Sequence, residues 1–367
     1  AFWYDESNGS FISSSYYGNS LPQWLVQFNN KHVADSFLNK PWNTLYPIST
    51  YSQSLADDNQ YEGKFKGEAT PTFPHLAQGK KGYDLIRRIP YGNTMTLMAA
   101  KACMEGELLG KGKQTDFLCI SLSSTDYVGH QFAPNSIEIE DTYLRLDKDI
   151  AEYLKYLDAK IGKGNYLVFL TADHGGAHNA QYLEDINIPS GNASEKKLKK
   201  QLREYVKTLT AIDSLILDIT NYQVVLDEGR IIKKGVNRKE LKQNIVAWLH
   251  TQPDIVYVMD MEQPHKAAIP EPIKTMAING YNRLRSGSIL IIYNPGWYQG
   301  YSPTGTTHGT WNPYDTHIPL LWYGWQIPKG QTNKLVHMED IAATLAAMLH
   351  IQMPNGCIGK PIEGLMK

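Results

Sequence analysis

Two short apolar runs on either side of a long amphipathic stretch constrain the fold of this chain more than any other feature. Residues 117–121 and 166–170 are each long enough for one strand, and residues 137–161 repeat apolar side chains at steps of three or four, as a helix requires. A strand, a helix and a second strand in this order predict a right-handed βαβ crossover. The unbroken hydrophobicity of the second strand predicts burial on both of its faces.

The rest of the chain extends this α/β pattern. Further strands are predicted around 224–225, 255–258, 288–293 and 318–323, and further helices at 95–109, 194–208, 238–250 and 338–349. Asn8 and Gly9 lie between two aromatic segments and predict a hairpin. Because no repeat or linker divides the sequence, residues 1–367 are interpreted as one domain with insertions near 20–93 and 190–300.

Composition excludes some classes of protein. The net charge is −1, with 20% charged residues, so the basic excess typical of nucleic-acid and membrane-surface binding is absent from the sequence. No apolar run reaches the roughly 20 residues of a membrane span. The three cysteines are too few and too scattered for a disulfide framework, and Cys119, inside an apolar run, is predicted to be buried. We therefore expect neither nucleic acid nor membrane as a partner.

Three polar clusters lie after or between predicted strands. Residues 123–130 contain Asp126 and His130, residues 171–176 contain Asp173 and His174, and residues 306–309 contain His308. Ligands gather at the carboxyl ends of strands in open α/β sheets, so these side chains are expected to converge. Each cluster alone is explained as ordinary loop residues, but all three in this order indicate a metal site. Imidazole and carboxylate suit zinc, and ligand type leaves manganese and iron open.

The sequence around these clusters resembles the alkaline phosphatase superfamily, and within it the bacterial monomeric alkaline phosphatases with phosphodiesterase-like features. The matching motifs are S-S-T-D-Y-V-G-H-Q-F-A-P-N-S at 123–136, D-T-Y-L-R-L-D at 141–147, T-A-D-H-G-G at 171–176, T-H-G-T-W-N-P-Y-D-T-H-I-P-L-L-W-Y-G at 307–324 and M-E-D-I-A-A-T-L at 338–345. The resemblance implies a three-layer αβα sandwich with a mostly parallel central sheet and insertions. It also implies a monomer that hydrolyses a small phosphate ester in the periplasm or outside the cell.

The resemblance also implies roles for the clustered residues. Asp126, His130 and His308 match the ligands of one zinc ion, and Asp173 and His174 match ligands of a second. Two such ions, roughly 4 Å apart, would clamp the attacking and leaving oxygens of an in-line displacement. His178 and His317 occupy similar places in family sequences, and we expect them to lie outside the ligand set.

The sequence departs from the family pattern ahead of Asp126. Family members carry an Asp that completes the second zinc site, then a Thr or Ser nucleophile, then an Asn and a Lys-x-Arg pair that hold the phosphate. None of these is found in the sequence here, and residues 1–17 resemble the segment that follows them. About a third of the parent enzyme is therefore expected upstream, with the chain alone inactive and holding one zinc ion or fewer firmly.

Two other interpretations stay open at this point. A phosphodiesterase or nucleotide pyrophosphatase of the same superfamily would differ mainly in the phosphate-binding residues expected upstream. A catalytically dead metal-binding domain would keep the same clusters without turnover. Sulfatase chemistry is disfavoured because no C-x-P-x-R signature is present in the sequence.

Overall fold

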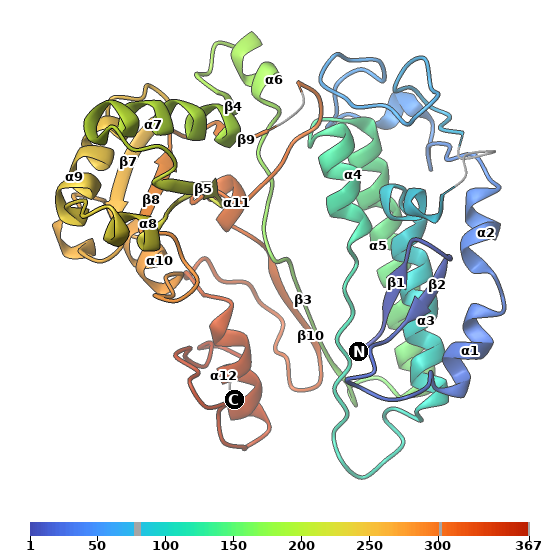
Figure 1. Ribbon diagram of the computed structural model, residues 1–367. Helices are drawn as coiled ribbons and strands as arrows, with labels where there is room; N and C mark the ends of the chain where they lie inside the picture. Colours follow the sequence, from blue (N-terminus) through green and yellow to red (C-terminus); the bar gives the residue numbers. More distant parts are fainter. Residues whose placement is uncertain (77–81, 301–302, 366–367) are drawn as a thin grey trace. The chain divides into compact units, whose positions relative to one another are not determined.

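The computed structural model describes residues 1–76, 82–300 and 303–365, which form two compact units (Figure 1). The first unit comprises residues 1–107, 118–147 and 174–318, and the second comprises residues 108–117, 148–173 and 319–367. Each unit therefore combines segments that are far apart in the sequence.

The first unit contains a mainly helical core built from residues 1–107 and 118–147. Phe132, Val128 and Leu25 are completely buried in it. The predicted hairpin is confirmed, with Trp3 paired to Ile12 and Gly9 in the left-handed region at the turn. The elements are β1 (Trp3–Asp5), β2 (Ser10–Ile12), α1 (Gln23–Asn29), α2 (Val33–Leu38), α3 (Tyr91–Gly106), α4 (Ser124–Phe132) and the start of α5 (Ile137–Lys160), with short 3-10 helices at Ile48–Thr50 and Tyr83–Arg88.

The same unit has a second core around a four-stranded antiparallel sheet. The strand order is β5-β6-β8-β7, and β8 is buried along its whole length. Leu202 of α7 and Ile245 of α9 are fully buried in this core, which explains the apolar periodicity of both helices. The elements are α7 (Glu195–Thr210), β5 (Ile216–Thr220), β6 (Gln223–Leu226), α8 (Glu228–Lys233), α9 (Arg238–Leu249), β7 (Ile255–Asp260), a 3-10 helix (Pro264–Lys266), α10 (Ile273–Asn279) and β8 (Ile289–Tyr293).

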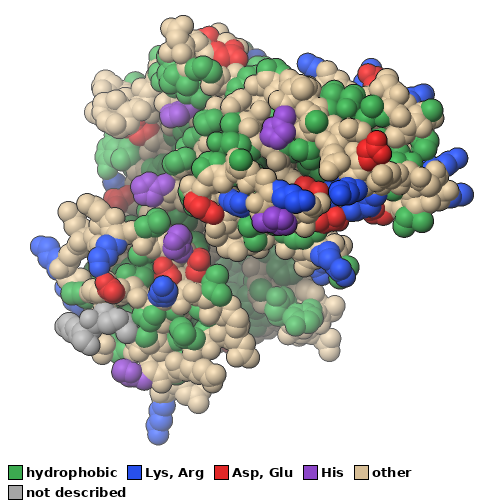
Figure 2. Space-filling model, turned by 90° about the vertical axis from the view of Figure 1, so that its left-hand side faces the viewer, with side chains coloured by type: hydrophobic (Ala, Val, Ile, Leu, Met, Phe, Trp, Pro, Cys, Tyr) green, Lys and Arg blue, Asp and Glu red, His purple; other side chains and the backbone are tan. Residues whose placement is uncertain are grey.

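Short elements complete the first unit. The strands β4 (Gly191–Ala193) and β9 (Trp297–Gln299) form a parallel pair, and the helices α6 (Ala180–Asp185) and α11 (Pro313–Thr316) flank it in sequence. Figure 2 shows a band of Lys and Arg side chains on one face of the molecule, with Asp and Glu side chains among them. Ion pairs such as Lys199–Asp218 neutralise part of the charge on α7.

The second unit is built around one antiparallel strand pair. The strand β3 (Leu167–Thr171) pairs with β10 (Leu320–Gly324), so that Leu167 lies opposite Gly324. The closing helix α12 (Glu339–Met348) begins and ends within two residues of its predicted bounds. Among the described helices, none is long and apolar enough to cross a bilayer.

Several strand predictions are wrong in detail. Residues 117–121 form no strand, and Phe117 and Cys119 are exposed, because no neighbouring strand of the described chain supplies backbone partners there. Without that strand the predicted βαβ crossover is not formed, and β3 is half-buried rather than buried on both faces. Among the described strands the one parallel pair is β4–β9, and the other pairs are antiparallel. The α/β class itself is confirmed.

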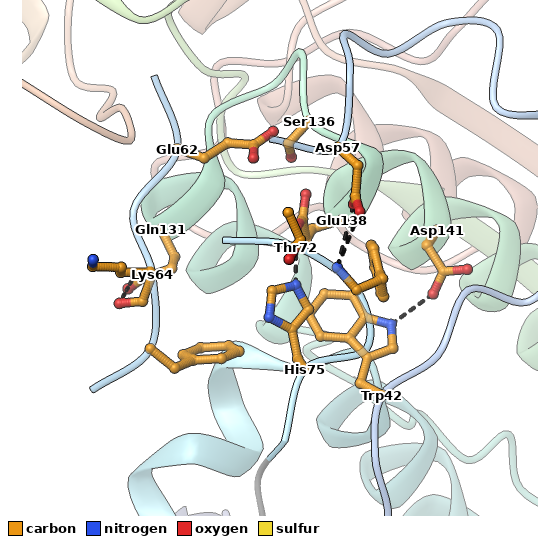
Figure 3. Close-up of polar contacts among 12 residues, drawn as sticks. Trp42, Asp57, Glu62, Lys64, Thr72, His75, Gln131, Ser136, Glu138 and Asp141 are labelled. Atoms are coloured by element: carbon orange, nitrogen blue, oxygen red, sulfur yellow. Dashed lines mark hydrogen bonds and ion pairs between the residues drawn. The ribbon is translucent and has the colours of Figure 1, made fainter. Parts of the chain in front are cut away.

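A buried polar network fixes the start of α5 in the first unit (Figure 3). The Trp42 indole Nε1 donates to Asp141 Oδ2 at 2.7 Å, and His75 Nε2 lies 2.9 Å from Glu138 Oε1. Figure 3 shows the carboxylates of Glu62 and Glu138 on the same side of the His75 ring. One oxygen of each of these two carboxylates is buried without a hydrogen-bond partner. This combination of buried charge and unsatisfied oxygens makes the network sensitive to protonation.

Candidate metal centre

The helix α4 supplies the first two residues of the site. Asp126 lies in its first turn and His130 in its last, so their spacing of four residues places both on one face. His130 Nε2 is 3.4 Å from Asp126 Oδ1. The start of the helix is held by Asn93, a buried side chain of α3 that accepts from Ser124 N and donates to Thr125 Oγ1. The spacing of Asp126 and His130 is therefore local, whereas the start of their helix is fixed by Asn93 of α3.

Two further imidazoles approach the same carboxylate from distant segments. His308 Nε2 lies 3.8 Å from Asp126 Oδ1, and His174 Nε2 lies 3.9 Å from it. The rings of His174 and His308 are stacked, with centroids 3.4 Å apart. The structure thus gathers four of the five predicted ligand residues around one oxygen atom.

Hydrogen bonds on the far side of two rings set their tautomers. His130 Nδ1 donates to the carbonyl oxygen of Thr306 at 2.8 Å, and His174 Nδ1 donates to that of Gly175 at 2.8 Å. Each Nε2 atom is then unprotonated in the neutral ring and presents its lone pair toward Asp126. Burial, and then the proximity of His174, lowers the pKa of His308 and favours its neutral form.

The donor set fits a cation such as zinc. Single ligand atoms of Asp126, His130 and His308 all lie within 4.8 Å of one another. A tetrahedral zinc ion with bonds of about 2.0–2.1 Å holds its ligand atoms roughly 3.3 Å apart. The His130 and His308 nitrogens, at 3.4 and 3.8 Å from Asp126 Oδ1, are already close to that spacing. A bound cation would also relieve the cost of crowding imidazoles beside a half-buried carboxylate.

Backbone contacts tie the loop that carries His308 to α4. Thr306 N donates to the His130 carbonyl while Thr306 O accepts from the His130 ring, so the two residues clamp each other. The buried Asn179 donates to the carbonyls of Pro303 and Gly305, and Ala177 N donates to Thr307 O. The sequence analysis did not identify Thr306 or Asn179 as site residues. The only local signal was the position of Asn179 at the start of α6, where it caps the helix.

Gly175 allows the segment after His174 to lie directly against the second loop. Its N–H donates to Asp315 O at 2.7 Å, and a Cβ at this position would collide with the Tyr314 carbonyl oxygen. Asp315 is buried and accepts from both Thr310 N and Thr310 Oγ1. Gly175 therefore allows close backbone approach, whereas a Cβ at Gly176 would meet nothing within 4 Å.

The sequence also singled out Asp173, His178 and His317. Asp173 is the last residue of the segment 148–173 of the second unit and its side chain is exposed, so its role as a ligand stays a prediction. His178 Nδ1 donates to Asn135 Oδ1 at 2.7 Å, and His317 is exposed after α11. These two assignments as residues outside the ligand set also stay predictions.

The type I phosphodiesterase / nucleotide pyrophosphatase family matches residues 1–317 of this chain. The chain belongs to this family. It is 46% identical to alkaline phosphatase PafA of Elizabethkingia meningoseptica over 99% of its own length and 67% of the relative's. It is 46% identical to alkaline phosphatase PhoV of Synechococcus elongatus, over 100% of this chain and 66% of the relative. It is 47% identical to a protein of Myroides odoratus named calcium-transporting ATPase, over 99% of this chain and 67% of that relative.

The solved structures agree with the sequence relatives. The crystal structure of wild-type PafA matches with a TM-score of 0.96 at 44% identity, covering 100% of this chain and 70% of that one. The chain therefore has the alkaline phosphatase-like fold and spans about two thirds of the length of its relatives. The family resemblance stated from the motifs is confirmed.

Proposed function

We propose that this chain carries the greater part of a zinc-dependent alkaline phosphatase that hydrolyses small phosphate monoesters. The observation that carries the proposal is the convergence of Asp126, His130 and His308 from segments up to 182 residues apart onto one potential cation position. The alkaline phosphatase names of PafA and PhoV support the reaction class. A zinc ion held there would supply a Lewis acid that stabilises negative charge on a phosphate-ester oxygen.

The side chains of this chain prepare the site for that chemistry. Asp126 supplies the negative charge that attracts a divalent cation, and the Thr306 carbonyl holds His130 with Nε2 toward it. Asp173 and His174 are proposed ligands of a second zinc ion, with a further ligand and the Thr or Ser nucleophile upstream of these residues. On this proposal the chain alone holds one zinc ion or fewer firmly and is inactive or nearly so. Its parent is a monomer in the periplasm or outside the cell, without nucleic acid or membrane as a partner.

The family match also supports a second candidate function. Because the matching family is that of type I phosphodiesterases and nucleotide pyrophosphatases, diester hydrolysis by the same site is the alternative. A metal-binding domain without turnover would keep the cluster and lose the reaction. Comparing a phosphate monoester, a diester and a metal-binding assay separates these three possibilities.

Metal content tests the proposal directly. The purified chain is loaded with zinc, desalted, and assayed by mass spectrometry and by anomalous scattering at the zinc edge. We expect about one ion at Asp126, His130 and His308. His308→Ala should lower zinc affinity by at least about tenfold, because removing one of three ligands leaves fewer than a catalytic zinc site normally has. His317→Ala, which removes an exposed histidine of the same loop region, is the matched control.

Activity is the second arm of the test. The same chain and a version extended by its upstream coding sequence are assayed on an aryl phosphate. We expect turnover only from the extended version. Turnover by the 367-residue chain at the rate of the extended protein would refute the upstream nucleophile, and zinc binding unaffected by His308→Ala would refute the metal centre.

A further inference from the structure

A cavity of about 520 Å³ adjoins the metal centre on the side of His308. Thr307, His308 and Gly309 form one wall of it, so one residue belongs both to the cavity and to the proposed ligand set. The volume lies in the range of small-molecule binding pockets. A group bonded to a phosphate at the metal centre can therefore extend into this cavity.

The lining of the cavity combines aromatic and other apolar side chains with neutral polar ones. Tyr222, Tyr281 and Trp311 contribute rings, Met261 and Met276 contribute thioethers, and the described lining includes no Asp, Glu, Lys or Arg. Tyr222 and Trp311 meet edge to face with ring centroids 5.4 Å apart. Aromatic edges and soft sulfur atoms favour flat, apolar rings, whereas an ionised group would find no charged partner.

The backbone at the tip of the β5–β6 hairpin is strained where it lines the cavity. Asn221 and Tyr222 are the two turn residues, with φ of 48° and 63°. Such turns prefer Asn followed by Gly, so a tyrosine at the second position is unusual and energetically costly. The Tyr222 carbonyl accepts from Ile291 N at 2.7 Å, which locks the tip onto β8.

That strained tyrosine lies directly beside the loop of the metal centre. A Cβ added at Gly309 would lie only 3.9 Å from Tyr222 Cε2, and Gly309 follows His308. The Tyr222 side chain is 7% exposed, so its ring is held in one position by its neighbours. A buried aromatic edge therefore lies beside the loop that carries the candidate ligand His308.

We propose that this cavity binds the aromatic alcohol portion of the phosphate ester, so that the enzyme prefers uncharged aryl or nucleoside esters to aliphatic ones. The proposal rests on the proposed function, because it assumes that the phosphate lies at Asp126, His130 and His308. Tyr222 and Trp311 then determine specificity through contact with the ring rather than through the reaction itself. A single ring and a nucleoside share the required chemistry and are distinguished by experiment.

Binding of non-hydrolysable analogues to the zinc-loaded full chain tests the inference. Benzylphosphonate carries a phenyl ring next to a phosphonate, and methylphosphonate carries the same anion without the ring. Dissociation constants come from calorimetry, with tryptophan fluorescence as a second readout. We expect benzylphosphonate to bind about tenfold more tightly, because only its ring packs against the aromatic lining. The phosphonate analogues of adenosine monophosphate and of ribose 5-phosphate form a second pair, and a preference confined to that pair would assign the cavity to nucleosides.

Variants decide whether the cavity causes the preference. Trp311→Leu and Tyr222→Leu should each bring the ratio of the two affinities close to one, whereas Trp311→Phe should retain most of it. Trp248→Leu is the matched control, because Trp248 packs on the same core from α9 and does not line the cavity. Equal affinities for both members of each pair, or a ratio unchanged in Trp311→Leu and Tyr222→Leu, would overturn the inference.

Zinc content measured on the same samples separates this inference from the proposed function. A zinc-loaded chain without preference for the ring contradicts the cavity assignment and leaves the metal centre standing. A chain that binds no zinc contradicts the proposed function, and the inference falls with it.

Discussion

The buried acidic network around His75 predicts that the folded protein loses stability as the pH rises above about 6.5. Burial, and then the charge of Glu138, raises the pKa of Glu62 to about 9. Burial alone would lower the pKa of His75, but its hydrogen bonds to Glu138 and Glu68 outweigh burial and raise that pKa to about 8. Both groups therefore hold protons in the folded state that the unfolded chain releases.

The sign and size of the effect follow from proton counting. Above a pH of about 6.5 an unfolded histidine and an unfolded glutamate are both deprotonated. The folded state keeps a proton on His75 until pH about 8 and on Glu62 until pH about 9, so unfolding releases protons and becomes easier as the pH rises. One proton corresponds to a slope of about 1.4 kcal/mol per pH unit, so both together approach about 2.7 kcal/mol per pH unit.

The substitution Glu62→Gln isolates the carboxyl contribution. Glutamine has the shape of the protonated side chain that the fold already favours, and it accepts from Asn59 as Glu62 Oε1 does. We expect the variant to be more stable than the wild type above pH about 6.5 and to lose stability less steeply, because its unfolding releases one proton fewer.

Urea unfolding followed by circular dichroism, in a metal chelator and at several pH values between about 6.5 and 8, measures these slopes. Glu184→Gln is the matched control, because it neutralises an exposed carboxylate on α6 and should leave the slope unchanged. A wild-type stability that is flat or rising across this range, or a Glu62→Gln slope equal to that of the wild type, would refute the reasoning.

One further prediction concerns the metal centre, and a second concerns the packing of the helical core. Gly175→Ala should weaken zinc binding although no ligand is removed, because the new Cβ displaces the Tyr314 carbonyl and the loop behind His308. Gly176→Ala is the control and should bind zinc like the wild type, because nothing lies within 4 Å of its added atom. Equal zinc affinities of the two variants would contradict this account. Phe132→Ala should lower the free energy of unfolding by about 3–5 kcal/mol, because Phe132 is 0% exposed at the end of α4. Val26→Ala, at a position that is 36% exposed, is the control for that measurement, and losses of similar size in both variants would contradict the packing argument.

The sequence by itself determined the parts of this protein that depend on neighbouring residues. The β1–β2 hairpin follows from its Asn8-Gly9 turn, and the helices α7, α9 and α12 follow from apolar side chains at helical spacing. The pairing of Asp126 with His130 is local too, because four residues make about one helical turn. Motifs spread along the chain indicated the family without any coordinates.

Only the tertiary structure decided which distant segments meet. It brought His174 and His308 to Asp126, left residues 117–121 without a strand partner, and paired β3 with β10 in antiparallel rather than parallel fashion. It also formed the cavity beside His308 from the β5–β6 hairpin tip, the helix α10, the strands β8 and β9 and several loops. Strand pairing and site assembly depend on backbone partners and loop closure far away in the sequence, whereas hydrophobic periodicity reports only which face of an element is buried.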